Sequence, residues 1–383
     1  MFDHPRGVCS LPGDSYNMRN LSVVGWVSVF LLASAIPLMG QDAAADMTVD
    51  AVTRVAVIEG VLKELSDFYI FPDVAAKMVQ AIKQRQQRNE YESITSARQL
   101  ADVLTTHLRD VSHDRHLAVN YSAAVVRPFP FPPPPPPAEL VARQQAAYSQ
   151  TNFGFAKVER LAGNIGYLDL RSFMPPAWIG ETLAAAMTFL GNTHALILDL
   201  RHNGGGGPDS VTLMCSYFFE QPVRLNDVYT RPSNETRQSW TSASVSGTRF
   251  VKKDVYILTS NATFSAAEDF TYAMKNLKRA TIVGEVTGGG AHPVGARRVA
   301  DHFLAAIPMG RSISPITHTD WEGVGVEPDI KVSASQALAR AHLIALEKLQ
   351  PSGGDPSMRE EVAAAIERLK SELRDADRGR VPR

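Results

Sequence analysis

The sequence predicts an α/β fold with a mainly parallel sheet, preceded by a helical N-terminal domain. From about residue 152 onward, short apolar runs alternate with segments of helical periodicity. One run, residues 195–200, is almost continuously apolar, which is typical of a strand buried on both faces of a parallel sheet. Strands that alternate with helices imply right-handed crossovers, and ligands bind beyond the carboxyl ends of such strands. The loops that follow the predicted strands are therefore the first places to search for a site.

The N-terminal segment predicts export. Residues 21–40 form an uncharged apolar run that follows Arg19 and precedes small and acidic residues. This pattern indicates a secretory signal peptide over residues 1–45, with Met18 as a second possible start. A run of about 20 apolar residues is also long enough for a membrane anchor. We therefore expect a periplasmic or extracellular protein, with a membrane-anchored form as the alternative.

The next two segments are predicted to be a helical domain, residues 46–120, and a proline-rich linker, residues 121–150. Apolar residues recur at helical spacing within residues 52–62, 74–82 and 97–108. Residues 128–137 read PFPFPPPPPP, which must be extended or disordered because proline lacks the N–H that a sheet needs. The helical domain ends in His113 and His116. On spacing alone these histidines belong to a solvated helix end, and they are a weak zinc signal without a third ligand.

The predicted core spans residues 151–335 and is followed by a helical tail, residues 336–383. Apolar runs predict strands at residues 165–170, 195–200, 255–258 and 280–283, and helical spacing predicts helices at residues 181–190, 211–219 and 264–277. With 39 basic and 40 acidic residues, the net charge of −1 gives no reason to expect nucleic acid or an anionic membrane as partner.

Two loops of the predicted core have residue types that suit catalysis. Residues 199–207 read DLRHNGGGG, and four glycines after a buried strand let backbone N–H groups approach an anion. The loop lacks the lysine of a phosphate-binding loop, so an oxyanion hole or a flexible turn remains. Ser265 lies where a strand passes into a helix, a common position for a nucleophile. It also fits a capping box with Glu268, in which the serine only caps the helix.

Four motifs in order, DLRHNGGG, TFSAAE, RATIVGEVTGGG and GVGVEPDI, resemble the C-terminal processing (tail-specific) serine protease family. The helical N-terminal sequence is similar to the branch that contains interphotoreceptor retinoid-binding protein. The resemblance implies a crotonase-like core with Ser265 as the nucleophile. It also implies an oxyanion hole formed by N–H groups of the glycine loop, at Gly204 and Gly205, and of Ala266.

The sequence departs from the family pattern in two respects. Gly290 stands where processing proteases of the Ser–Lys type have their lysine base. The tricorn protease core uses Ser–His–Glu instead, and the matching positions here are His116 as base and Glu322 as its orienting carboxylate, with His113 and His292 as the next candidates for the base. The second departure concerns the substrate-binding PDZ module of many relatives. We expect no PDZ module, because residues 119–150 are too short to hold one.

The sequence therefore predicts an exported serine peptidase that cleaves peptide or protein substrates by acyl transfer, with no cofactor, metal or nucleotide. The alternative is a non-catalytic protein that binds apolar ligands, retinoid or fatty-acid like, on the same fold. An esterase with the same active site is a third possibility.

Overall fold

The computed structural model describes residues 46–131, 133–349 and 356–378. The predicted signal peptide lies outside the described residues. Within the described ranges, no helix combines the length and apolarity needed to cross a membrane.

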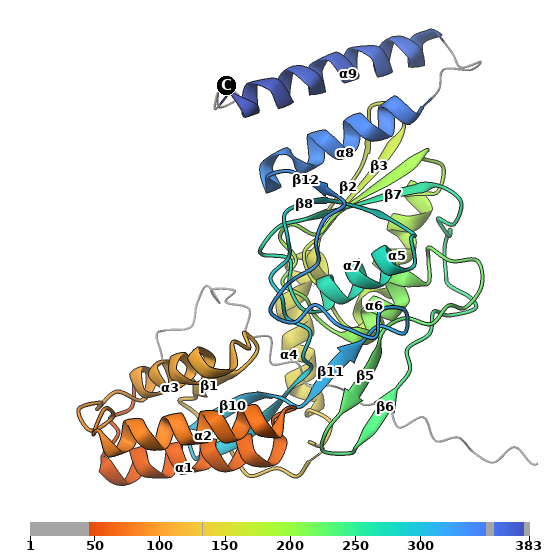
Figure 1. The fold of residues 1–383 in the computed structure, drawn as a ribbon. Helices are drawn as coiled ribbons and strands as arrows, with labels where there is room; N and C mark the ends of the chain where they lie inside the picture. Colours follow the sequence, from red (N-terminus) through yellow and green to blue (C-terminus); the bar gives the residue numbers. More distant parts are fainter. Residues whose placement is uncertain (1–45, 132, 350–355, 379–383) are drawn as a thin grey trace, which may run out of the picture.

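Three helices form the N-terminal part of the molecule and pack on a small antiparallel sheet (Figure 1). Each helix has a recognisable start: Asp50 and Ser96 cap the first and third through their side chains, and Pro72 opens the second. The sheet has the order β1-β10-β9, so strands from late in the chain complete the N-terminal part. The elements are α1 (Ala51–Phe68), α2 (Pro72–Gln87), α3 (Ala97–Ser112), β1 (Ala118–Tyr121), β9 (Val294–Ala300) and β10 (Phe303–Pro308).

The segment predicted as a linker is partly helical. The proline run gives way to α4 (Ala138–Ser149), because residues 138–149 are rich in alanine, glutamine and other good helix formers. A short 3₁₀ turn, η1 (Asn152–Gly154), then leads into the core.

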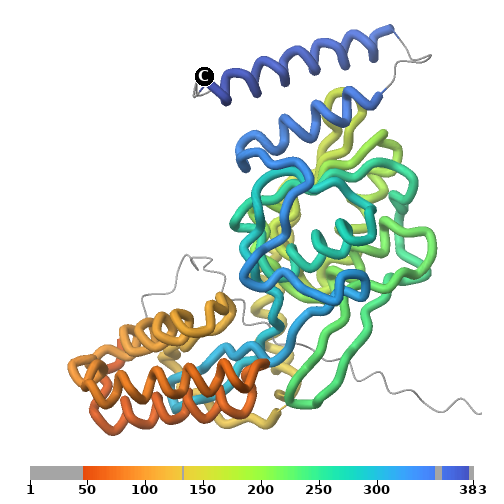
Figure 2. Tube along the Cα trace, in the orientation of Figure 1, coloured from red at the N-terminus to blue at the C-terminus, as the bar shows by residue number. Residues whose placement is uncertain are grey.

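The core is built on a six-stranded sheet in which all strands are parallel except β2, which confirms the predicted fold class. Helix α8 covers one face and α5, α6 and α7 cover the other, while α9 packs outside α8 (Figures 1 and 2). The strand order is β12-β8-β7-β4-β3-β2. The bounds are β2 (Phe155–Leu161), β3 (Ile165–Leu170), α5 (Pro176–Leu190), β4 (Ala195–Asp199), α6 (Pro208–Cys215), β7 (Asp254–Thr259), α7 (Ala266–Asn276), β8 (Thr281–Gly284), β12 (Ile330–Lys331), α8 (Ala334–Lys348) and α9 (Pro356–Asp377).

Helix α5 begins at Pro176, five residues before the start predicted at residue 181, and two further details differ from the predicted elements. The helix expected at residues 211–219 starts earlier, with Pro208 in its first turn, and ends at Cys215 in a turn. A second small antiparallel sheet has the strand order β11-β5-β6, and its strands lie in segments where the sequence predicted none. Its strands are β5 (Asp227–Thr230), β6 (Glu235–Arg237) and β11 (Gly310–Ile313).

The register of the parallel sheet brings three loops to one edge. Asp199 of β4 pairs with Leu258 of β7, and Thr259 pairs with Gly284 of β8. The loops that follow these strands therefore start side by side at the carboxyl ends, as predicted for such folds.

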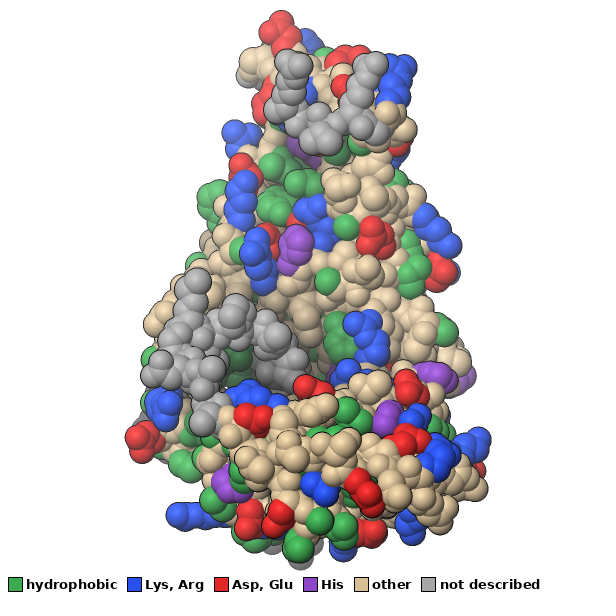
Figure 3. All heavy atoms as spheres, turned by 90° about the vertical axis from the view of Figure 1, so that its left-hand side faces the viewer, with side chains coloured by type: hydrophobic (Ala, Val, Ile, Leu, Met, Phe, Trp, Pro, Cys, Tyr) green, Lys and Arg blue, Asp and Glu red, His purple; other side chains and the backbone are tan. Residues whose placement is uncertain are grey.

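Surface charge is mixed on the face shown in Figure 3, where acidic and basic side chains are interspersed. This agrees with the net charge of −1.

Candidate active site

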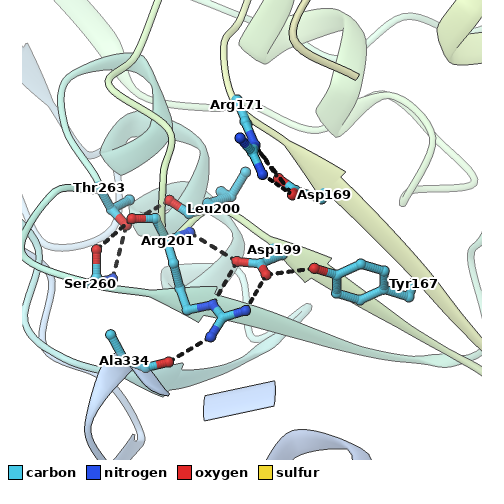
Figure 4. Close-up of polar contacts among 9 residues, drawn as sticks. All are labelled: Tyr167, Asp169, Arg171, Asp199, Leu200, Arg201, Ser260, Thr263 and Ala334. Carbon is cyan, nitrogen blue, oxygen red and sulfur yellow. Dashed lines mark hydrogen bonds and ion pairs between the residues drawn. The ribbon is translucent and has the colours of Figure 1, made fainter. Parts of the chain in front are cut away.

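An ion pair at the end of β4 anchors the first glycine-rich loop (Figure 4). The Arg201 guanidinium donates from Nε to Asp199 Oδ1 at 2.9 Å and from Nη2 to Oδ2 at 2.6 Å. Its Nη1 donates to the carbonyl of Ala334 at 2.6 Å, which ties the loop to the start of α8. Burial opposes ionisation of Asp199, but the hydrogen bonds from Arg201 and Tyr167 outweigh it and lower the pKa of this carboxyl. The loop therefore starts from a rigid base.

Side-chain to backbone hydrogen bonds hold the second loop against the first (Figure 4). The hydroxyl of Ser260 donates to the carbonyl of Arg201 at 2.5 Å, and that of Thr263 donates to the carbonyl of Leu200 at 2.8 Å. Further along, the Phe264 N–H donates to the carbonyl of Asn203 at 3.0 Å. Residues 59 to 63 positions apart in sequence thus form one rigid unit around Ser265.

Ser265 has an unusual backbone conformation. Its φ of 56° and ψ of −120° place a non-glycine residue in a region that costs roughly 1–3 kcal/mol. It is the N-cap of α7, and Glu268 forms its half of the predicted capping box by accepting the N–H of Ser265, while the hydroxyl of Ser265 makes no cap hydrogen bond. Strain of this kind at a turn between strand and helix is common where a side chain must be presented to a ligand. The capping and catalytic roles of Ser265 are compatible.

Glu268 connects the second loop to the third. Its fully buried carboxylate accepts the N–H of Ser265 at 2.8 Å, the hydroxyl of Thr287 at 2.5 Å, and the N–H groups of Gly289 and Gly290 at 2.6 and 2.8 Å. Burial raises the pKa of Glu268, and these donors counteract part of that shift. One carboxylate thus fixes the positions of Ser265 and of the loop that contains Gly290.

Two backbone N–H groups beside Ser265 have no acceptor within the described ranges, and these belong to Gly206 and Ala266. Both residues line the same cavity as Ser265. The N–H of Gly205, in contrast, already donates to Asn203 Oδ1 at 2.9 Å. Gly205 must nevertheless be glycine, since its φ is +111° and a Cβ there would lie 2.8 Å from the Cβ of Ser265.

His116 packs beside the nucleophile candidate without a polar partner for its buried nitrogen. Its ring lies 4.6 Å, centroid to centroid, from the ring of Phe264, the residue before Ser265. Its Nδ1 is buried and has no hydrogen-bond partner in the described chain. Burial is the main cause that lowers the pKa of His116 to about 4, so the imidazole is neutral at neutral pH.

His292 lies between two carboxylates. Its Nδ1 is 2.7 Å from Asp114 Oδ2 and 3.5 Å from Glu322 Oε2. Burial alone would lower the pKa of His292, but the hydrogen bond to Asp114 and the charge of Glu322 raise it above 6.5. Burial, with the charge of Asp114, raises the pKa of Glu322 to about 7. These three residues could offer ligand atoms to a metal ion, but the short Nδ1–Oδ2 distance is that of a direct hydrogen bond.

A cavity of about 190 Å³ opens beside Ser265. Its wall includes Gly206 and Ala266 on the oxyanion side, His292 from the third loop, and Asp269 from α7. Residues from the β5-β6 hairpin also line it. The cavity is thus a candidate substrate site with a hydroxyl, two free N–H groups and an imidazole in its wall.

Sequence reasoning identified most of these residues but not all of their partners. The structure places Ser265, Ala266 and His116 around the strained turn, whereas the imidazole nearest to Glu322 is that of His292. Sequence reasoning missed Asp114, the bridging role of Glu268, and Gly206. Asp114 was detectable only as a carboxylate two positions before His116, because its partner His292 is 178 residues away.

Two family models and several curated proteins match the chain. Residues 164–332 match the model of peptidase family S41, and residues 50–147 match that of the N-terminal domain of S41 peptidases in eukaryotic IRBP. The chain is 30% identical over 166 residues to chloroplastic carboxyl-terminal-processing peptidase 2 of Arabidopsis thaliana, covering 43% of this chain and 31% of that protein. It is 29% identical over 172 residues to the carboxyl-terminal-processing protease of Synechocystis, covering 43% and 37%.

A solved structure shares the fold. A lipoprotein from Streptococcus agalactiae superposes with a TM-score of 0.53 at 15% identity, over 77% of this chain and 97% of that one. The chain belongs to peptidase family S41. Its matches span about a third of the length of the two curated relatives, 31% and 37%.

Proposed function

We propose that this protein is a serine peptidase in which Ser265 attacks the carbonyl of a peptide bond and forms an acyl-enzyme. The observation that carries the proposal is the presentation of Ser265 on a strained turn beside two N–H groups without acceptors, Gly206 and Ala266. Such donors stabilise the oxyanion of the tetrahedral intermediate, and each is worth about 100- to 1,000-fold in rate. Of the donors expected from sequence, Ala266 is kept, and Gly206 replaces Gly205, whose N–H is already engaged. Gly204 is a second candidate donor from the loop.

In the proposed mechanism His116 takes the proton of Ser265 and later gives it to the leaving amine, while Glu322 balances the imidazolium. Support comes from two buried atoms without partners, His116 Nδ1 and Glu322 Oε1. A hydrogen bond between these two atoms would satisfy both. Catalytic hydrogen bonds are often long in unliganded sites and tighten when substrate binds.

His292 is the second candidate for the base. It already has the carboxylate contact of a catalytic histidine, 2.7 Å from Nδ1 to Asp114, and it lines the cavity with Ser265. In this alternative Asp114 takes the orienting role.

Labelling with a fluorophosphonate probe tests the nucleophile. Ser265→Ala should abolish labelling, whereas Ser244→Ala, which removes an exposed hydroxyl outside the cavity wall, should retain it. Undiminished labelling of the Ser265→Ala protein would remove Ser265 from the mechanism. An apolar-ligand carrier would be indicated by a folded wild-type protein that resists the probe and retains a bound lipid.

Separate substitutions identify the base. His116→Ala should lower the acylation rate by at least about a thousandfold, as removal of a triad histidine does. His292→Ala should lower it less if His292 serves only to position Asp114 and Glu322. If His292→Ala is the more damaging change, His292 is the base.

We also propose that the protein is exported, on the strength of the apolar residues 21–40 and the charged residue before them. Fractionation of expressing cells with an antibody against the core tests this. Retention of the full-length chain in the cytoplasm would contradict it.

A further inference from the structure

The cavity beside Ser265 contains a carboxylate that the proposed mechanism does not use. Asp269 lies four residues after Ser265, hence on the same face of α7 and one turn away. It forms part of the cavity wall together with Ser265. A group at this place can contact the substrate side chain next to the bond that Ser265 attacks.

Asp269 is incompletely paired. Its Oδ1 accepts a hydrogen bond from Nδ2 of the buried Asn226 at 2.7 Å. Its Oδ2 has no donor, and no cation pairs with it, anywhere in the part of the chain that the structure describes. A half-buried carboxylate with one donor is costly to keep ionised, and burial raises the pKa of Asp269 to about 6. At neutral pH the group is still mostly ionised and lacks a counter-ion.

The other charged residues of the cavity wall are mostly acidic as well. The wall also contains Asp209 and Glu235, while its guanidinium, that of Arg237, lies 3.4 Å from Asp209. Apart from His292, three carboxylates therefore face one cation, an excess of two negative charges. A concave site with this charge attracts cationic groups and repels anionic ones.

The apolar part of the wall suits a long side chain with a charged end. Pro208, Val228 and Trp321 contribute apolar surface to it. Lysine and arginine bury their methylene stems against such surface while the charged head finds a polar partner. A short apolar side chain would leave Asp269 desolvated and unpaired, which is unfavourable.

We propose that Asp269 is a specificity-determining residue, and that the cavity selects substrates with lysine or arginine at the residue whose carbonyl Ser265 attacks. This inference rests on the proposed serine peptidase function and names its substrate class. Asn226 then holds one oxygen of Asp269 and leaves the other for the substrate cation.

Two matched substrates test the inference on the unaltered protein. They are fluorogenic peptide amides that differ only in arginine or citrulline at the cleaved residue, because citrulline keeps the shape and loses the charge. We expect kcat/KM to be about 100-fold higher for arginine, the effect of pairing a partly desolvated charge. Equal rates for the two substrates would overturn the specificity and leave the proposed function intact.

Substitutions then assign the preference to Asp269. Asp269→Asn, which keeps the size and the contact with Asn226, should reduce the arginine-to-citrulline ratio to nearly one, mainly by lowering kcat/KM for arginine. The matched control is Asp209→Asn at an exposed position of the same wall, which should change the ratio by no more than a few fold. A ratio that survives Asp269→Asn would contradict the assignment.

A second measurement needs only wild-type protein, so it remains available if Asp269→Asn folds poorly. It also separates the proposed basic specificity from the proposed serine peptidase function. Benzamidine, a cation with the shape of benzamide, should slow fluorophosphonate labelling of wild-type protein at concentrations where benzamide has no effect. Labelling that neither compound slows would overturn the basic specificity alone. Absence of any labelling and any hydrolysis would overturn the serine peptidase function, and the inference with it.

Discussion

The carboxylate of Glu268 holds the backbone of Ser265, with 2.8 Å between Glu268 Oε2 and the nitrogen of Ser265. The same oxygen lies 2.8 Å from the nitrogen of Gly290. The capping interaction predicted from sequence is thus part of a larger bridge. It fixes the strained turn of the proposed nucleophile relative to the third glycine loop, from which His292 enters the cavity wall.

The bridge predicts a specific effect of Glu268→Ala. The change leaves three buried N–H groups and the hydroxyl of Thr287 without their acceptor, so unfolding free energy should fall by about 3 kcal/mol or more. The activity of the remaining folded protein should fall as well, because the turn of Ser265 loses its support. Urea denaturation and kcat/KM measure the two effects. Glu360→Ala, at an exposed position on α9, is the control and should change neither by much. A Glu268→Ala protein of wild-type stability would show that the bridge contributes little.

Local patterns in the sequence predicted the parallel core well. Residues 165–170 form the predicted strand with the same bounds, and the strands β4, β7 and β8 and helix α7 agree to within one or two residues. These elements have strong apolar periodicity of their own. The position of Ser265 between a strand and a helix was also predicted, because these elements are adjacent in sequence, but its strained backbone conformation was not.

Pairings between distant segments could not be read from the sequence. Ala118 of β1 pairs with Ala306 of β10, and neither short strand has a distinctive pattern by itself. The same holds for the site: the contact between Asp114 and His292 joins two loops that are 178 residues apart. The family resemblance predicted that Glu322 contacts His116, whereas the imidazole nearest to Glu322 in the structure is that of His292. Side-chain pairing depends on how the loops pack, which periodicity does not specify.

The proposed triad predicts a rise in activity around neutral pH. Glu322 must be ionised to balance the imidazolium, and its pKa is raised to about 7. His116, with its pKa lowered to about 4, is neutral from pH 5 upward and adds no further change in rate over this pH range. A plot of kcat/KM, which reports the free enzyme, should therefore increase from pH 6 to pH 8. Glu322→Gln should lower the plateau and remove this limb. Persistence of the limb in that variant would assign it to His292, whose pKa is also raised.

The ion pair between Asp199 and Arg201 predicts a large loss of stability on truncation. Asp199 is 2% exposed and Arg201 16% exposed, so Arg201→Ala leaves a buried charge without its partner. The expected decrease in unfolding free energy is about 3–5 kcal/mol. The control is Lys331→Ala in β12 of the same sheet, because Lys331 and its partner Glu327 have side chains that are 69% and 59% exposed. An exposed pair is worth at most about 1 kcal/mol. Similar losses in the two variants, measured by urea denaturation, would contradict the role given to burial.

The absence of a lysine at position 290 predicts that the site cannot be converted simply to a Ser–Lys dyad. A Cβ on Gly290 would lie 2.3 Å from Cζ of Phe264 and 2.6 Å from Cε1 of His116. Contacts this short force both rings to move, so Gly290→Ala should already reduce kcat/KM, by about tenfold or more for a displacement near 1 Å. Gly180→Ala in α5, where a Cβ meets nothing within 4 Å, should leave activity unchanged and stabilise the helix slightly.

Gly290→Lys should not restore activity to the His116→Ala protein while Phe264 is present. In the His116→Ala, Phe264→Ala background the lysine stem has room, and the pH profile of any recovered activity would then follow the lysine. Recovery with Phe264 intact would show that the ring of Phe264 yields easily and that sterics do not exclude a lysine base from this position.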